Sequence, residues 1–125
     1  AELLAPFFGL GLYGDLFENA SGIAFIDNMG VLCNIVNGSS SCADAGTLIF
    51  ALHLKLIQLS AAIWWEWVPS ASNCADGGSR VGVTCELARS LGVSLRAIAC
   101  PTLPNNFMTL GPEAWADFWN SFRQL

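Results

Sequence analysis

Two short apolar runs, each followed by a carboxylate, constrain what this chain can fold into. The run Ile23–Ile26 and the Asp27 that ends it have the length of a buried strand, about 23–27. The run Ile63–Val68 is rich in tryptophan and predicts a second strand, and Asp76 follows it after a short loop. A helical segment lies between the two runs, so we expect a parallel strand–helix–strand unit and an α/β fold. Carboxylates at the carboxyl ends of such strands are well placed to hold a divalent metal.

Periodic apolar residues predict helices around these strands. The strongest pattern covers 44–61, in which four leucines form one stripe while polar residues, among them Lys55, face away. Gly9, Gly11 and Gly14 weaken the helical pattern of residues 1–18. Further helices are predicted over 1–18, over 29–36 with Asn37–Gly38 as its end, near Asn73, over 84–91 with Gly92 as its end, and over about 112–123 after an extended connector over 93–111.

Composition narrows the class of protein. Hydrophobic residues make up 54% of the 125 residues and charged residues 12%, so the chain can fill the core of one domain and still expose apolar surface that a neighbour should cover. The net charge of −5 is the wrong sign for a stand-alone nucleic-acid binder. The odd count of five cysteines, none in a CxxC pair, indicates free thiols in a reducing compartment, either cytoplasmic or nuclear. The apolar region 48–68 contains charged side chains and is a poor membrane span.

Three motifs in the chain resemble parts of one family. The residues that carry the resemblance are Trp67-Val68-Pro69-Ser70, Asn73, Ala75-Asp76 and Ser79-Arg80, together with Phe25-Ile26-Asp27-Asn28 and Glu2-Leu3-Leu4-Ala5. This pattern is similar to the ribonuclease H domain of retroelement reverse transcriptases, in particular those of tyrosine-recombinase retrotransposons. The Trp-Val-Pro-Ser to Ser-Arg motif is the most specific of the three.

The resemblance implies a chemistry for these residues. The family holds two Mg²⁺ ions on four carboxylates, one ion activating water and the other stabilising the leaving 3′ oxygen as RNA paired to DNA is cut. Glu2, Asp27 and Asp76 match three of the four positions and would be both catalytic residues and metal ligands. Asn28, Asn73 and Arg80 would bind substrate. The implied partners are the RNA–DNA hybrid and the upstream reverse transcriptase domain of the same polyprotein, with no membrane.

The same resemblance implies a partial fold. Residues 1–92 match the ribonuclease H-like domain from its glutamate helix onward, so the first three strands and the first aspartate are missing, and 93–125 form a C-terminal extension. We therefore expect this chain alone to be weakly active or inactive. The alternative, from a different class, is a catalytically inactive remnant that serves as a structural or protein-interaction module.

The candidate residues also have structural readings. Asp27 could cap the helix that follows it, Asp76 could be a first-turn carboxylate favoured by the helix dipole, and Asn73 could be a helix cap. Arg80 could form a surface ion pair in place of a phosphate contact. The aromatic stripe of the last helix could dock on the domain or on a partner, and His53, the only histidine, has the position of a structural residue.

Overall fold

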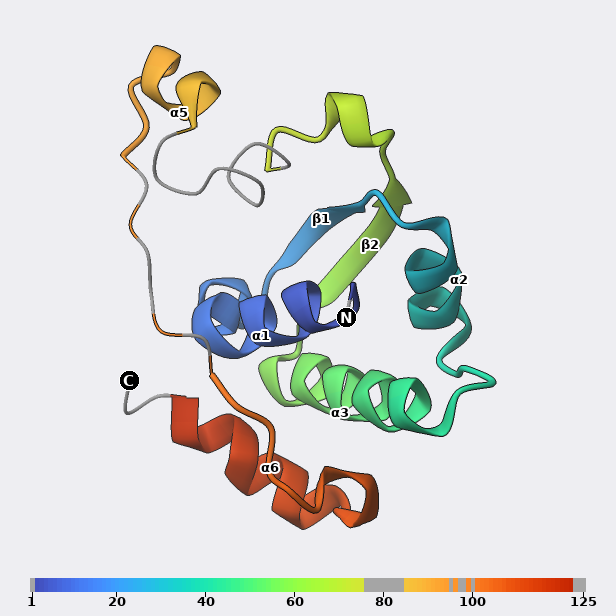
Figure 1. Cartoon of the computed structure of the whole chain (residues 1–125). Coiled ribbons are helices and arrows are strands. Elements are labelled where there is room, and N and C mark those ends of the chain that lie inside the picture. The colour runs from blue at the N-terminus through green and yellow to red at the C-terminus, as the bar shows by residue number, and fades with distance from the viewer. Residues whose placement is uncertain (1, 76–84, 95, 97–98, 100, 123–125) are drawn as a thin grey trace.

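The computed structural model of the chain describes residues 2–75, 85–94, 96, 99 and 101–122 (Figure 1). These residues form a mixed α/β structure with two parallel strands, as the sequence predicted at this coarse level. The elements in chain order are α1 (Leu4–Tyr13), the 3₁₀ turn η1 (Gly14–Phe17), β1 (Ser21–Ile26), α2 (Met29–Asn37), α3 (Ala43–Leu59), β2 (Ala62–Trp67), the 3₁₀ turn η2 (Ser70–Ser72), α5 (Glu86–Ser90), the 3₁₀ turn η4 (Phe107–Thr109) and α6 (Pro112–Ser121).

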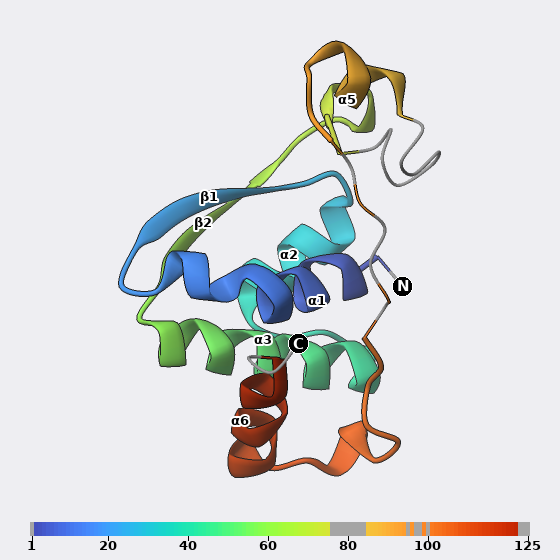
Figure 2. The ribbon, with the colours of Figure 1, turned by 90° about the vertical axis from the view of Figure 1, so that its left-hand side faces the viewer.

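The sheet in the described residues consists of β1 and β2, paired in parallel from Ser21 opposite Ala62 to Ile26 opposite Trp67. The parallel pairing predicted from the sequence is confirmed. The expectation that the first strand is buried is wrong, because its side chains alternate between exposed and half-buried along its length. The elements are stacked with the sheet as the outermost layer, followed by α1 and α2, then α3, then α6 (Figure 2).

Local signals set most helix boundaries close to the predicted positions. The helix α2 ends at Asn37, and Gly38 follows it with a left-handed φ of 75° that glycine adopts without strain. The helix α3 ends two residues earlier than predicted, because Ser60 takes a left-handed conformation with φ 51°. The first helix is shorter than the predicted 1–18 and gives way to η1 at the buried Gly14. A Cβ atom at Gly14 would lie only 3.1 Å from the side chain of Leu59, so glycine permits this close approach of η1 to α3.

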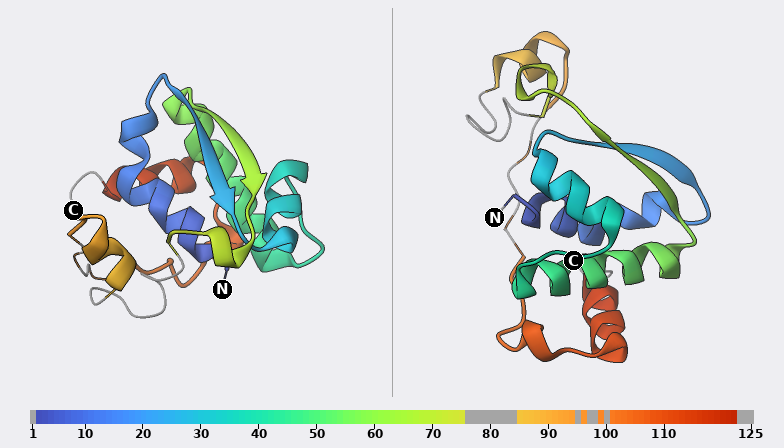
Figure 3. Two further views of the ribbon diagram at one scale, coloured as in Figure 1. Left: turned by 90° about the horizontal axis from the view of Figure 1, so that it is seen from above. Right: turned by 90° about the vertical axis from the view of Figure 1, so that its right-hand side faces the viewer.

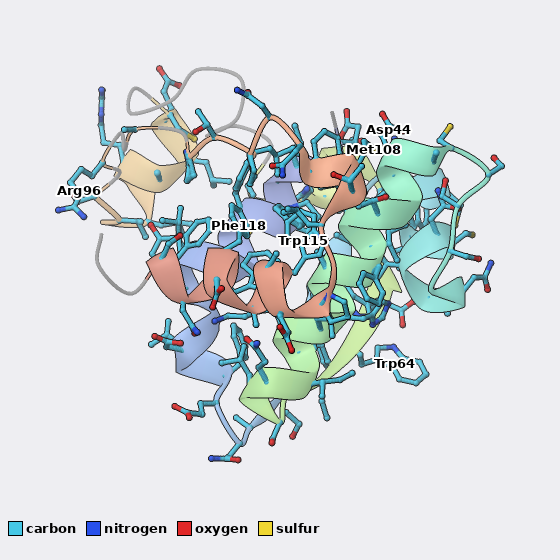
Figure 4. The ribbon with its side chains drawn as sticks, turned by 90° about the horizontal axis from the view of Figure 1, so that it is seen from below. Asp44, Trp64, Arg96, Met108, Trp115 and Phe118 are labelled. Carbon is cyan, nitrogen blue, oxygen red and sulfur yellow. The ribbon has the colours of Figure 1, made fainter. Side chains whose placement is uncertain are left out.

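Side chains of α1, α3 and α6 build the main core. Phe7 of α1 and both Trp115 and Trp119 of α6 are fully buried, and the rings of Phe7 and Trp119 lie 4.7 Å apart between centroids. The Trp119 indole also donates a hydrogen bond of 2.8 Å to the carbonyl of Ala51 in α3. Figure 4 shows α6 lying across α3, with the Trp115 side chain directed into the body of the molecule. The aromatic stripe of the last helix therefore docks on this chain. The domain boundary at residue 92 stays a prediction.

Lys55 corrects one expectation about α3. The four leucines of the predicted stripe are buried, but Lys55 is only 2% exposed and does not face away. Its Nζ lies 4.0 Å from a carboxylate oxygen of Asp15 in η1. The long aliphatic stem of lysine packs well in an apolar setting when its ammonium group reaches a partner. The prediction from helical periodicity was wrong because it treated Lys55 as a polar, exposed residue.

Two further helix predictions concern the chain after β2. The helix expected to start near Asn73 would run into residues 76–84, which lie outside the described part of the chain. The predicted helix over 84–91 is present as the short α5, and Gly92 follows it with φ 72°. Within the described residues, no helix has the length and apolar character needed to cross a membrane.

Candidate functional site

Asp27 lies where the sequence placed it, directly after the last residue of β1 and half-buried. Because β1 and β2 run in parallel, their carboxyl ends lie side by side at the same end of the sheet. The loop after β2 therefore starts beside Asp27. Figure 3 shows both arrowheads pointing toward the side of the molecule on which the N-terminus also lies. The structure thus places Asp27 beside the start of the loop that follows β2.

Two side chains from the β2 end hold Asp27 in place. The Asn73 side-chain amide donates a hydrogen bond of 3.1 Å from Nδ2 to Oδ2 of Asp27. The Trp67 indole donates from Nε1 to the Asp27 backbone carbonyl at 3.3 Å. Trp67 and Asn73 both belong to the motif that resembles ribonuclease H, so the residues of that motif meet the Asp27 strand end in space. The Trp67 contact was not predicted, and only its place opposite Ile26 in a parallel pair could have indicated it.

Asn28 answers one of the questions that the sequence left open. Its Oδ1 accepts a hydrogen bond of 3.0 Å from the backbone N–H of Val31, so Asn28 is the N-cap of α2. The capping role considered for Asp27 therefore belongs to its neighbour, and the Asp27 carboxylate is directed to Asn73 instead. The substrate-binding role of Asn28 stays a prediction, with the amide nitrogen as the group that would meet a ligand, because the oxygen serves the helix.

The remaining predicted site residues are Glu2, Asp76 and Arg80. Glu2 is exposed and precedes α1, whose amino end lies on the side toward which both strands run (Figure 3). Asp76 and Arg80 lie outside the described residues. Ala75, the residue before Asp76, donates its backbone N–H to Asn73 Oδ1 at 3.0 Å. The Asn73 side chain therefore contacts both Asp27 and Ala75, the residue before Asp76.

The described donors fit a divalent metal only in part. Carboxylate oxygens are the ligands that Mg²⁺ prefers, and Asp27 offers them in a half-buried position. In the part of the chain that the structure describes, however, no three His, Cys, Asp or Glu side chains gather closely enough to hold an ion. The described residues therefore do not form a complete set of metal ligands around Asp27.

A cavity elsewhere in the described residues has neither Glu2 nor Asp27 among its lining residues. It has a volume of about 530 Å³ and lies between α2, α3 and β2, with Ile35, His53 and Trp64 among its lining residues. The His53 ring makes a hydrogen bond of 2.9 Å between Nε2 and the Ile35 carbonyl, which ties α3 to α2. His53 thus has the structural role that its sequence position indicated. Cys33, Cys42, Cys74 and Cys85 are free thiols.

Comparison with known proteins adds no relative to this description. A scan with protein-family models gave no match, and searches of the curated proteins and of the solved structures gave no significant match either. The resemblance to ribonuclease H therefore depends on the quoted motifs and on the contacts that those motifs make around Asp27.

Proposed function

We propose that this chain belongs to a Mg²⁺-dependent ribonuclease H-type nuclease that cleaves RNA in RNA–DNA hybrids within a retroelement reverse transcriptase polyprotein. The observation that supports this most directly is the hydrogen bond between Asn73 and Asp27, because it joins two separate motifs of the resemblance at one edge of a parallel sheet. The partial ribonuclease H-like fold over 1–92 is part of the same proposal.

The proposed site assigns a task to each residue. Asp27, with Glu2 and Asp76, would hold Mg²⁺, and the bound ions would supply an activated water and charge stabilisation for the leaving 3′ oxygen. Asn28 and Arg80 would contact the nucleic acid near these carboxylates. The chain has five Lys and Arg residues against ten Asp and Glu. Long-range attraction of a hybrid would therefore come from the upstream reverse transcriptase domain, which is the proposed partner.

The test is hybrid cleavage by the full-length parent protein in Mg²⁺. We expect Asp27→Asn and Asp76→Asn each to abolish cleavage, because an amide cannot replace the charge of a metal-binding carboxylate. Asp117→Asn is the matched control, since Asp117 is exposed on α6 on the far side of α3 from the sheet. Cleavage at the wild-type rate by either site variant would show that the site assignment is wrong.

A second measurement concerns the isolated chain. Because the family uses four carboxylates and this chain supplies three, we expect it to bind Mg²⁺ weakly and to show little cleavage by itself. Isothermal titration calorimetry measures this directly. Tight magnesium binding would contradict the proposal that a ligand from the upstream sequence completes the site.

One observation favours the alternative function, a catalytically inactive module for structure or protein interaction. The outer face of the sheet carries Ile23, Phe25 and Trp64, which are 63%, 60% and 67% exposed. Parallel sheets are ordinarily covered on both faces, so an exposed apolar face of this kind is typical of a sheet that packs against another domain or protein. Figure 4 shows the Trp64 side chain directed away from the body of the molecule.

The backbone of β1 also favours the alternative function, a module for structure or protein interaction. Ala20 and Ile26 accept hydrogen bonds from the β2 side, so residues of odd number on β1 direct their N–H and C=O groups to the opposite, outer edge. A groove of about 180 Å³ lies beside this strand, between α1 and the sheet. Cleavage by the full-length parent separates the two functions: an active parent supports the nuclease, and an inactive parent that retains Asp27 and Asp76 supports the module.

A further inference from the structure

The free edge of β2 faces away from β1 and lies on the side of α2 (Figure 3). Ala62 donates its backbone N–H to the Ala20 carbonyl at 3.0 Å, so Ala62 and every second residue after it direct their backbone groups to β1. The N–H and C=O groups of Ile63 and Trp65 therefore point to the free edge. Among the residues that the structure describes, none of these groups has a hydrogen-bond partner.

The cavity of about 530 Å³ between α2, α3 and β2 lies at this edge, because Ile63 and Trp65 are among its lining residues. Its lining also includes Val36 of α2, Ile57 of α3 and Trp64 of β2, which are 63%, 73% and 67% exposed. A strand directs every second side chain to the same face. An added strand could therefore pair with the backbone of β2 and place its inward side chains in this cavity.

The walls of the cavity are held together within the chain. The His53 ring in α3 donates from Nε2 to the Ile35 carbonyl in α2 at 2.9 Å, and both residues line the cavity. Ser60, with its left-handed φ of 51°, turns the chain from α3 into β2 on another side of the same cavity. A binding segment would therefore meet a formed surface, which lowers the entropic cost of association.

The unpaired backbone groups indicate an extended segment as the occupant. A helix satisfies its backbone groups internally, so it cannot pair with the edge of a sheet. Natural proteins often protect edge strands with lysine or proline. The sequence of β2, Ala-Ile-Trp-Trp-Glu-Trp, contains neither. Its edge is therefore open to pairing with another strand.

Charge complementarity indicates which kind of segment would bind. Lys55 is the only Lys or Arg among residues 2–75, and it is 2% exposed. Glu66 is exposed on β2 itself, directly after Trp65, and Glu18 is exposed as well. A second copy of this chain would bring like charges together, whereas a segment that carries Lys or Arg beside its apolar residues would be attracted.

We propose that the free edge of β2 binds an extended, basic segment of another protein by strand addition, with alternate apolar side chains of that segment in the cavity beside Ile63 and Trp65. Main-chain hydrogen bonds would supply affinity, and the cavity would select apolar side chains at alternate positions. This inference rests on the second function, the protein-interaction module, and names its partner; it is independent of the proposed metal site.

The probe is a set of fluorescein-labelled peptides of about six residues, with valine, leucine or phenylalanine at alternate positions and threonine or lysine between them. Fluorescence anisotropy measures binding to the chain, and amide hydrogen exchange followed by NMR locates it. We expect a saturating peptide to slow exchange of the Ile63 and Trp65 amides at least about tenfold, because a paired amide exchanges only when the pairing opens. Exchange at Ile23 and Phe25, on the free edge of β1, should be unchanged.

Three variants test the surface. Ile57→Ser removes an apolar side chain from the cavity and should weaken binding about tenfold. Leu16→Ser is the matched control, since Leu16 is 79% exposed on η1 and does not line the cavity. Glu66→Gln should weaken binding of the lysine peptides about two- to fivefold and leave the threonine peptides unchanged. All three residues are exposed, so the unfolding midpoints should stay near that of the wild-type chain.

Peptide binding that slows exchange at Ile63 and Trp65 and is weakened in Ile57→Ser supports the proposal. Binding that leaves the exchange of both amides unchanged, equal losses in Ile57→Ser and Leu16→Ser, or no binding by any peptide of the set would overturn it. Slowed exchange that appears without peptide as the chain concentration rises would show a second copy on this edge and overturn the choice of partner. Hybrid cleavage by the full-length parent is a separate measurement, so failure here removes this partner without deciding between nuclease and module.

Discussion

The two buried tryptophans of α6 provide a sharp test of the core. Trp115 and Trp119 are both fully buried beside Phe7, but their indole N–H groups differ. Trp119 donates to the Ala51 carbonyl at 2.8 Å, whereas the N–H of Trp115 is buried with no hydrogen-bond partner among the described residues. The same substitution to phenylalanine therefore removes a bond at one position and an unpaired donor at the other.

The magnitudes follow from these environments. Both substitutions remove the same atoms and cost part of the about 3–5 kcal/mol that truncation of a buried aromatic to alanine costs. Trp119→Phe also loses a hydrogen bond worth about 0.5–1.5 kcal/mol. Trp115→Phe relieves the burial of an unsatisfied donor, which by itself costs about 1–3 kcal/mol. We therefore expect Trp119→Phe to lower the free energy of unfolding by at least about 1.5 kcal/mol more than Trp115→Phe.

Urea unfolding followed by far-UV circular dichroism measures the difference without using tryptophan as the reporter. The slope of the free energy against urea should be the same for all variants, so that the midpoints report stability. Trp64→Phe is the control, since Trp64 is 67% exposed and should change stability by less than about 0.5 kcal/mol. Equal losses for the two core variants, or a larger loss for Trp115→Phe, would refute the account of α6.

Three further predictions test other parts of the fold. Gly38→Ala should cost about 1–2 kcal/mol because φ is 75° there, whereas Gly9→Ala in α1, where a Cβ has open space, should gain about 0.5–1 kcal/mol; chemical denaturation distinguishes the two. Asp15→Asn should lower stability by about 1 kcal/mol or less because Asp15 is more than half exposed, and Lys55→Met should leave thermal stability unchanged or raise it; a large loss in the methionine variant would contradict the apolar setting of this lysine. Ile23→Lys should slow aggregation, measured by light scattering, because a charge on an edge strand opposes strand pairing between molecules. Equal aggregation rates for the variant and the wild-type chain would show that β1 does not mediate aggregation.

Much of the fold could be predicted from local sequence. The strand that ends just before Asp27, the helix that ends just before Gly38 and the helix that begins after Gly111 all follow from periodicity and capping signals that act over a few residues. The burial of Lys55 could not be predicted, because it depends on η1 bringing a carboxylate next to α3.

The site shows the same division. The position of Asp27 directly after a strand could be predicted from the apolar run before it, but the contacts of Asn28 and Asn73 could not be assigned by pattern. Each is an asparagine next to a turn, yet one caps a helix locally and the other reaches a carboxylate 46 residues away. Only the parallel register of β1 and β2, which brings their carboxyl ends together, separates the two.

The central proposal is that Asp27 and Asp76, together with Glu2, would hold a divalent cation at the carboxyl ends of the two strands. Anomalous scattering from Mn²⁺ in crystals of the full-length parent tests it most directly. The account predicts an anomalous peak in contact with carboxylate oxygens of both Asp27 and Asp76. Crystals in which the two carboxylates point to different faces of the molecule, or in which Mn²⁺ binds without either of them, would contradict it.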